Sequence, residues 1–285
     1  MISFISYRWK VNPVILQYLV LLSLCSSTIS AQEKDASLTA DSAIFKMEKY
    51  EGQTSTDSIQ TSDSAGVNHY KSQLLFIEET LNKCIAMYST VRDYTCVFHK
   101  TERIEDTLIE EKDIIYKFMK PLSVYLRWPS GSEAIYVEGK YDNDLKFHSG
   151  NIFGFIVFSL DPRGNLAMTD NRHSILESHI GYIIHLVEQN YNRAKSNNEL
   201  KSFFEGKEVI NGKETLLIKV VFPANKNYYG HIIYFNVDSA LYLPEKIVVY
   251  GWDMELLEMY HFSNIHINVG LTESDFDIDN PSYDF

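Results

Sequence analysis

The spacing of hydrophobic residues predicts two helices in this chain and strands over most of the remaining length. Over residues 74–91, apolar side chains recur at steps of three and four, which predicts a helix with one apolar face. These positions are Leu74, Ile77, Leu81, Ile85, Tyr88 and Val91. The same spacing predicts a second helix over residues 175–195. Its apolar positions are Leu176, Ile180, Ile183, Ile184, Val187 and Tyr191.

Strands are predicted after Asp93, where the chain is rich in Tyr, Phe, Val and Ile and is broken by short turn sequences. In "PLSVYLRW", residues 121–128, apolar and polar side chains alternate, as in a half-buried antiparallel strand. Residues 203–222 predict a hairpin, because Asn211-Gly212 can supply the two positive φ angles of a type I′ turn. The fold class that follows is α+β with an antiparallel sheet.

Three predicted strands are apolar on both faces, namely residues 153–158, 216–222 and 231–235. Such strands either have protein on both sides or offer one side to an apolar partner. Two helices are few for covering a sheet of many strands, which favours a partly filled concave side. The sequence leaves both interpretations open.

The first 31 residues have the features of a secretory signal peptide. Arg8 and Lys10 precede an apolar run over residues 14–24 that is short for a membrane span, and small polar residues follow up to Ala31. Lipid modification at Cys25 is an alternative, and an uncleaved membrane anchor is a third. We predict export to the periplasm or cell envelope of a Gram-negative bacterium, with cleavage after Ala31.

Residues 32–68 are predicted to form a disordered polar linker, because they contain few large apolar side chains that could be buried. Residues 69–285 are predicted to form one domain. Loss of Arg8 and Lys10 with the signal peptide changes the formal charge from −12 to −14. This acidity argues against binding of nucleic acid or anionic lipid surfaces, both of which attract basic proteins.

Cys84 and Cys96 are an even pair in a chain predicted to be exported, where a disulfide can persist. The alternative is two buried thiols, because Cys84 falls on the apolar face of the first predicted helix. The sequence does not decide between them.

The segment "TDNRHSI", residues 169–175, resembles part of a catalytic site, but a structural interpretation is stronger. Ser174 and Glu177 have the spacing of a capping box, in which the Ser hydroxyl accepts the Glu177 amide proton and the Glu carboxylate returns to the Ser174 amide. Upstream, residues 161–164 have the preferences of a type I turn, with Asp first, Pro second and Gly fourth. We therefore predict that Ser174 is a cap and not a nucleophile.

Motifs for metal, nucleotide or hydrolytic chemistry are not found in the sequence. His173, His179 and His185 are spaced by six residues, which turns successive side chains to different sides of a helix and disfavours a shared metal. There is no H-E-x-x-H, paired C-x-x-C, phosphate loop, G-x-G-x-x-G or G-x-S-x-G. We predict no catalytic residues, no metal, no cofactor and no nucleotide.

Five segments, in order, resemble the bacterial domain-of-unknown-function family 1571. They are "DYTCVFHKTERI", "KFMKPLSVYLRW", "EAIYVEGKYDNDLKFH", "LDPRGNLAMTDNRHSI" and "GLTESDFDIDNPSYDF". A broader similarity, carried by "KPLSVYLRW", residues 243–247, Phe276 and Pro281, is to the LolA-like and RseB-like superfamily of periplasmic lipoprotein carriers and regulators. One departure is Ser174, where family members often have Pro. The resemblance implies a curved, incomplete antiparallel β-barrel with two main helices packed in its concave side.

The same resemblance implies an apolar concave side that holds acyl chains in the carrier members, and it supplies no catalytic residues. Two functions follow: binding of a lipid, acyl chain or lipidated protein, or a regulatory module that binds an envelope protein or peptide. The residues proposed to contact an apolar ligand are Leu126, Trp128, Ile135, Val137, Trp252, Tyr260 and Phe262. The family-like motif residues expected to be structural are Arg172, His173, Ser174 and Glu177.

Overall fold

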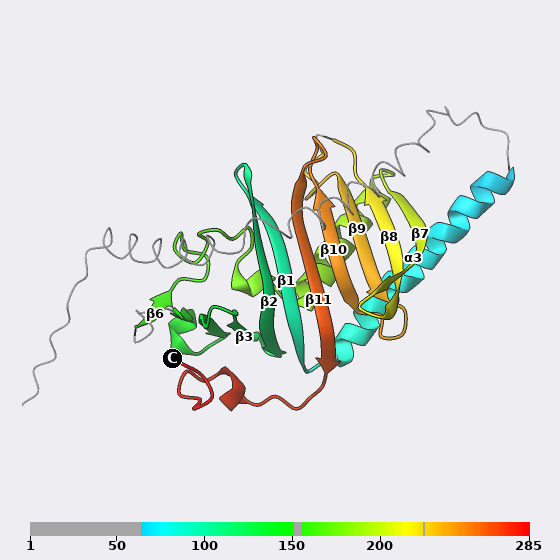
Figure 1. Cartoon of the computed structure of the whole chain (residues 1–285). Helices are drawn as coiled ribbons and strands as arrows, with labels where there is room; N and C mark the ends of the chain where they lie inside the picture. Colours follow the sequence, from blue (N-terminus) through cyan, green and yellow to red (C-terminus); the bar gives the residue numbers. More distant parts are fainter. Residues whose placement is uncertain (1–63, 151–155, 225) are drawn as a thin grey trace, which may run out of the picture. The chain divides into compact units, whose positions relative to one another are not determined.

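The computed structural model describes residues 64–150, 156–224 and 226–285. Eleven antiparallel strands form one sheet in the order β6-β5-β4-β3-β2-β1-β11-β10-β9-β8-β7 (Figure 1). Strands β6 and β7 are the two edges and do not pair with each other, so the curved sheet stays open. This confirms the predicted α+β fold with an incomplete barrel and two helices. The predicted signal peptide, Cys25 and most of the predicted linker lie outside the described residues.

The strand bounds follow the hairpin pattern that the sequence predicted. The strands are β1 (Asp93–Ile104), β2 (Thr107–Met119), β3 (Ser123–Arg127), β4 (Glu133–Val137), β5 (Leu145–His148), β6 (Val157–Leu160), β7 (Lys201–Ile210), β8 (Lys213–Val221), β9 (Ile232–Asp238), β10 (Pro244–Tyr250) and β11 (Leu256–Ile267). Strands β1 to β6 pair in sequence order, and so do β7 to β11. The pairing of β1 with β11 joins these two halves of the sheet.

Two helices pack on one face of the sheet, which we call the inner face. Helix α3 (Ser64–Thr90) contacts β7 and α4, and helix α4 (Ile180–Ser196) contacts β10. Both turn their predicted apolar positions into the core; Ile77 is 2% exposed and Ile183 is also 2% exposed. Helix α3 begins at Ser64, earlier than the domain boundary predicted at residue 69, because the helical pattern continues through the end of the predicted linker.

Local predictions for the hairpin and for strand β3 are confirmed. Asn211 and Gly212 have φ angles of 50° and 78°, so the β7–β8 connection has the two positive φ angles of a type I′ turn. In β3, Val124 and Leu126 face the inner core, whereas Tyr125 belongs to a second apolar cluster on the other, outer face. The alternation of the sequence therefore places β3 correctly, but both of its faces are buried.

The outer face of β3 and β4 is covered by the C-terminal segment, residues 271–285. Phe276, in the short 3-10 helix η3 (Glu273–Phe276), is 1% exposed and packs with Tyr125. The Tyr283 ring stacks on Tyr125 at a centroid distance of 4.1 Å, and Lys117 pairs with Asp275 at 3.0 Å. In Figure 1 this red segment lies beside β3.

Strands β8 and β9 have apolar side chains of low exposure on both faces. Ile218 and Phe235 face the core beneath the helices, and Leu217 and Ile232 on the outer face are 7% and 8% exposed. The third segment, residues 153–158, is described only from Ile156, and Val157 in it is 39% exposed.

The two cysteines are buried, free thiols, Cys84 on α3 and Cys96 on β1. Burial raises the pKa of Cys84 to about 12 and that of Cys96 well above its ordinary value, so both are protonated at neutral pH. The structure therefore corresponds to the thiol alternative and not to the disulfide.

Gly181 allows α4 to begin against the ring of Tyr88 on α3. A Cβ atom at residue 181 would lie 2.3 Å from two ring carbons of Tyr88, closer than any real Cβ contact. The ring cannot turn away freely, because Tyr88 is also covered by the Lys120 ammonium, 4.2 Å from the ring centroid. The first turn of α4 therefore requires glycine at this position.

We expect Gly181→Ala to lower the free energy of unfolding by about 1–3 kcal/mol, because the added methyl group overpacks this contact. Urea unfolding followed by circular dichroism measures the loss. Gly66→Ala on α3 is the matched control, because nothing lies within 4 Å of its Cβ position and alanine favours helix, so stability stays equal or rises. An equal loss in both variants would contradict the role of the Gly181 contact.

Candidate functional site

Two buried carboxylates lie side by side on the inner face of the sheet. Glu102 on β1 is the direct register partner of Glu258 on β11, and their side chains are 3% and 1% exposed. Like charges directly opposite each other on neighbouring strands destabilise a sheet. Removing both from water adds a further cost, unless hydrogen-bond donors and cations compensate for it. The surrounding residues supply these groups.

Glu102 is held by groups from three places in the chain. Lys100 Nζ lies 3.3 Å from Glu102 Oε2, the Tyr260 hydroxyl donates to Oε1, and the backbone N–H of Arg172 donates to Oε2 at 3.1 Å. Burial alone would raise the pKa of Glu102, but the charge of Lys100 and the hydrogen bond from Tyr260 outweigh burial and lower it. Glu102 is therefore a carboxylate at neutral pH.

Lys100 extends the network toward β2. Its ammonium also pairs with Glu111 at 3.1 Å and donates to the side-chain oxygen of Asn171. Burial alone would lower the pKa of Lys100, but Glu111 and Glu102 outweigh it and raise the pKa above its ordinary value. The lysine therefore remains a cation although its side chain is only 11% exposed.

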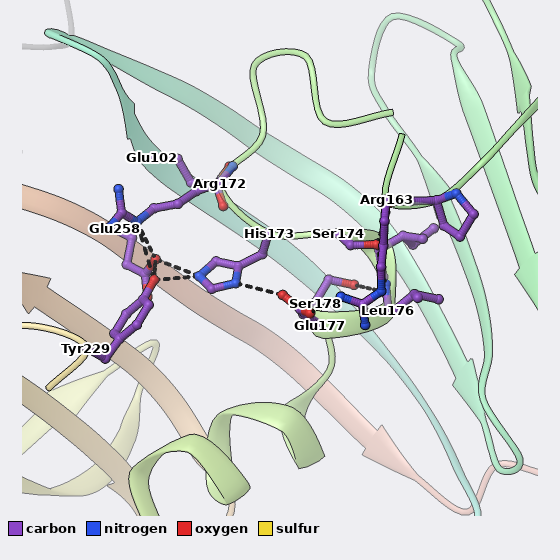
Figure 2. Close-up of polar contacts among 12 residues, drawn as sticks. Glu102, Arg163, Arg172, His173, Ser174, Leu176, Glu177, Ser178, Tyr229 and Glu258 are labelled. Carbon is purple, nitrogen blue, oxygen red and sulfur yellow. Dashed lines mark hydrogen bonds and ion pairs between the residues drawn. The ribbon is translucent and has the colours of Figure 1, made fainter. Parts of the chain in front are cut away.

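Glu258 is held by a tyrosine, an arginine and a histidine. The Tyr229 hydroxyl, from the loop between β8 and β9, donates to Glu258 Oε2. Arg172 Nε and His173 Nε2 lie 3.4 Å and 3.0 Å from the same oxygen. Figure 2 shows His173 between Glu258 and Tyr229 on one side and Glu177 on the other.

His173 bridges two carboxylates. Its Nδ1 atom lies 3.2 Å from Glu177 Oε2, and Arg163 Nη1 donates to the other oxygen of Glu177 at 2.8 Å. Burial alone would lower the pKa of His173, but the hydrogen bond and charge of Glu258, followed by Glu177 and Glu102, raise it above 6.5. The histidine therefore gains a proton more readily in this site than in water.

The arginine and the histidine come from residues 161–178, which we call the covering segment. It connects β6 to α4, and its regular structure within the described residues is one 3-10 turn, η2 (Ile175–Glu177). It begins in the predicted turn, where Gly164 N donates to Asp161 O at 2.9 Å. Leu176 and Ile175 pack partly buried against the inner core, so the segment lies over the inner face.

The predicted capping box at Ser174 is wrong in its partners. Ser174 does cap a turn, but its hydroxyl accepts from the Leu176 amide at 3.4 Å and donates to the carbonyl oxygen of Pro162 at 2.7 Å. Glu177 turns its carboxylate to His173 and Arg163 instead of to the Ser174 amide. The ion pairs of Glu177 are stronger than a hydrogen bond to a neutral amide, which explains the difference.

The α-helix itself starts later than predicted, at Ile180, and is capped by another residue. His179 Nδ1 accepts from the Tyr182 amide at 3.1 Å, and its ring stacks on Phe118 at a centroid distance of 5.1 Å. Burial and the nearby Lys120 lower the pKa of His179 to about 4, so it stays neutral. His185 is mostly exposed on α4 and lies 3.9 Å from Glu188. The three spaced histidines thus have separate surroundings.

The seven residues predicted to contact an apolar ligand are not brought together. Leu126, Trp128, Tyr260 and Phe262 belong to the inner core, where Phe262 is fully buried and Tyr260 binds Glu102. Ile135 and Val137 lie on the outer face under the C-terminal segment, because their strand β4 pairs with β3 in a register that sets Ile135 opposite Tyr125. Trp252 is 40% exposed in the β10–β11 turn.

The network itself was not predicted, although part of its signal is in the sequence. In β1 the inner positions run Tyr94, Cys96, Phe98, Lys100 and Glu102, so charged residues continue an apolar register. In β11, Glu258 likewise continues the inner register of Tyr260 and Phe262. Charges in the inner register of a strand indicate a buried ionic site, but not which partners reach it.

The charged groups of the site bind one another. The acidic groups Glu102, Glu258 and Glu177 are each occupied by cations or hydroxyl donors from this chain. Among residues 64–150, 156–224 and 226–285, no group of three His, Cys, Asp or Glu side chains is placed to bind a metal ion. The arrangement fastens the covering segment to the sheet through charged groups.

Residues 91–285 match the family described as "Protein of unknown function (DUF1571)", and the chain belongs to this family. The resemblance found in the sequence is thereby confirmed. No significant match was found among curated proteins.

Solved structures that match this chain include three bacterial proteins. The complex of MucA and MucB from Pseudomonas aeruginosa shares 12% identity over 70% of this chain and 59% of that chain, with a TM-score of 0.37. The lipoprotein LppX of Mycobacterium tuberculosis shares 12% identity over 70% of this chain and 97% of that chain, with a TM-score of 0.39. LprF from Mycobacterium bovis shares 9% identity over 68% of this chain and 93% of that chain, with a TM-score of 0.40. At these identities the similarity concerns the fold alone.

Neither α3 nor α4 has an apolar stretch long enough to cross a bilayer, and this statement covers the described residues only.

We expect Arg172→Met to lower the free energy of unfolding by about 3 kcal/mol, because it removes one of the two cations of the buried Glu258, which then keeps His173 and the Tyr229 hydroxyl. The value lies at the lower end for buried pairs, since the Arg172 side chain is 30% exposed. Lys207→Met is the control, because its pair with Glu214 is on the surface, with side chains 57% and 50% exposed, and contributes about 0–1 kcal/mol. Urea unfolding measures both. Equal losses of unfolding free energy in the two variants would show that the buried pair contributes no more to stability than the surface pair.

Proposed function

We propose that this protein is an exported, non-catalytic binding protein that holds an acyl chain of a lipid or of a lipidated protein against the inner face of β3–β6. The observation that carries the proposal is a strip of three aromatic side chains, Trp128, Phe147 and Phe158, on that part of the sheet. The strip is packed less completely than the part of the inner face that lies beneath α3 and α4.

The aromatic strip runs from Trp128, directly after β3, to Phe147 on β5 and Phe158 on β6. The Trp128 and Phe147 rings meet edge to face at a centroid distance of 6.5 Å, and Phe147 and Phe158 are register partners with centroids 6.5 Å apart. All three side chains are only partly buried, whereas Phe235 and Phe262 beneath the helices are 2% and 0% exposed. Partly buried aromatic surface gains free energy when an apolar chain covers it, at roughly 25 cal/mol per Å².

Trp128 adds a polar group to the strip. Its indole N–H is buried, and among the described residues no atom accepts a hydrogen bond from it. A buried donor without an acceptor costs about 1–3 kcal/mol. An ester or carboxyl oxygen at the head of an acyl chain would accept this hydrogen bond and remove the cost. The strip therefore favours an acyl chain that carries an acceptor oxygen over a pure hydrocarbon.

The covering segment is the element that a ligand would displace. It is fastened mainly through Arg172 and His173 to the carboxylates Glu102 and Glu258, in addition to the partly buried Ile175 and Leu176. Polar attachments can be exchanged for water with a smaller loss than packed apolar contacts, which supports a segment that can leave the inner face.

The export predicted from the sequence supports acyl-chain binding. The signal-peptide features of residues 1–31, with Cys25 as the alternative lipid-anchor site, support a location in the periplasm or on an envelope membrane, where acyl chains are available.

A second function, the binding of an envelope protein or peptide, is favoured by a different surface. Trp252 and Met254 in the β10–β11 turn and Leu108 at the start of β2 are 40%, 37% and 42% exposed. The two turns are tied together because Arg103 Nε donates to Leu256 O at 2.8 Å. Rigid, exposed aromatic and Met side chains are frequent anchors of protein interfaces.

We expect the protein, purified from the periplasm of a Gram-negative host, to carry an acyl-containing molecule that native mass spectrometry detects and organic extraction identifies. Phe147→Ser should lower its affinity at least about tenfold, because an aromatic ring contributes roughly 1.5–3 kcal/mol when buried. Trp128→Phe keeps the ring and loses the donor, so its affinity should fall by a smaller factor.

Leu75→Ser on α3 is the matched control, because Leu75 is 68% exposed and far from the strip in the fold, so ligand retention stays unchanged. Urea unfolding confirms that each variant is folded. A protein that is empty in repeated preparations, or folded Phe147→Ser protein that keeps its ligand, would reject acyl binding and favour the protein-binding function.

A further inference from the structure

We propose that the covering segment is a pH-sensitive lid that is locked when His173 is protonated and released when it loses the proton. This inference rests on the proposed function, because it assigns the regulation of access to the inner face. The geometry of the two ring nitrogens of His173 carries it.

Both ring nitrogens of His173 face carboxylate oxygens. Nε2 lies 3.0 Å from Glu258 Oε2, and Nδ1 lies 3.2 Å from Glu177 Oε2. Nε2 also lies 2.5 Å from the Tyr229 hydroxyl, which can donate to this nitrogen only when the nitrogen carries no proton. An ionised carboxylate only accepts hydrogen bonds, so a neutral ring, with one N–H group, can donate to only one of the two carboxylates. The bridge between Glu177 and Glu258 is therefore complete only when the histidine is protonated.

The groups around His173 come from every element packed against it. The ring is surrounded by Glu102 on β1, Glu258 and Tyr260 on β11, Tyr229 in the β8–β9 loop, Glu177 in η2 and Tyr182 on α4. Its sequence neighbour Arg172 is also charged. Burial and Glu258 raise the pKa of Tyr229, and burial with Glu258 and Glu102 does the same for Tyr260, so both keep their protons. Arg172 stays charged at all pH values of interest. Among these groups, His173 is the one that titrates near neutral pH.

The direction of the pH dependence follows from the raised pKa of His173. The stabilisation of the closed lid by protonated His173 is complete below the ordinary histidine pKa of 6.5. This stabilisation is lost as the pH rises through the higher pKa that His173 has in the closed state. Between these two values the equilibrium constant for lid opening should rise about tenfold per pH unit, because opening releases one proton. Above the higher pKa it should become constant.

Loss of the proton weakens the lid at the point where it crosses the sheet. Glu177 then keeps Arg163, whose guanidinium lies on the same segment, so that pair does not fasten the lid to the sheet. Glu258 keeps Arg172 at the longer distance of 3.4 Å and the Tyr229 hydroxyl. The bridge from the 3-10 turn η2 to strand β11 is the contact that depends on the proton.

The experiment is hydrogen–deuterium exchange with mass spectrometry on the full protein without added ligand, between pH 5.5 and 9, with rates corrected for intrinsic exchange. Peptides from residues 165–178 should lose protection as the pH rises, about tenfold per unit over the titration range, while peptides from β8 and β9 keep theirs. In His173→Gln the covering segment should be less protected at pH 5.5 and show no such titration.

Two variants separate His173 from the other histidines and from general destabilisation. His185→Gln removes an exposed histidine on α4, with a side chain 60% exposed, and should titrate like the unmodified protein. Glu177→Gln removes one of the three carboxylates that raise the pKa of His173, so the midpoint of the protection change should move to lower pH. A merely structural contact would not move the midpoint.

The lid is rejected if protection of residues 165–178 is independent of pH, or if it changes only together with β8 and β9, which would be global unfolding. Failure of the proposed function has a different signature. The exchange measurement needs no ligand. A protein that carries no lipid but whose covering segment changes its protection with pH rejects acyl binding alone. A protein that carries lipid but whose covering segment keeps the same protection at every pH rejects the lid alone.

Discussion

The pair of carboxylates on β1 and β11 is the constraint that organises the inner face. Glu102 and Glu258 sit opposite each other where the two halves of the sheet join, and both are buried. Lys100 and Tyr260 on the same two strands bind Glu102, whereas Glu258 takes its cations and its hydroxyl donor from segments that cross the sheet. This requirement explains why residues 161–178 lie over the strands and why the β8–β9 loop brings Tyr229 to the same place.

The outer face follows another principle. The strands β3 and β4 are apolar on both sides, and the C-terminal segment covers their outer side through Phe276 and Tyr283 instead of a third helix. Its charged ends are fixed as well, since Lys117 pairs with Asp275 and the Asp284 amide donates to the buried Glu133 at 2.8 Å. Two helices are sufficient on the inner side because the chain supplies an irregular cover on the other.

Local pattern predicted the elements of this fold, and long-range contacts account for what it missed. The helices, the Asn211-Gly212 hairpin and the alternation in β3 depend on residues close in sequence, so periodicity and turn chemistry were enough. Ile135 and Val137 were assigned to the ligand side because a strand apolar on both faces gives no sign of which face is inner. The network joins residues 102, 173, 229 and 258, and no spacing rule connects positions so far apart. Ser174 shows the same limit, since Arg163 and His173 take the carboxylate that a capping box requires.

A buried ionic network is not the most stable way to fasten a segment to a sheet. The loss of hydration of Glu102, Glu258 and Lys100 is large, and apolar side chains of similar size would often give equal or greater stability. What charged groups add is a defined geometry, because each donor must meet its acceptor, and a dependence on protons that apolar packing cannot provide. The apolar positions of α3 and α4 already hold the helical half of the inner face. The covering segment is instead attached through charged groups at β1 and β11, and a reversible attachment is useful to a protein proposed to take up and release an apolar ligand.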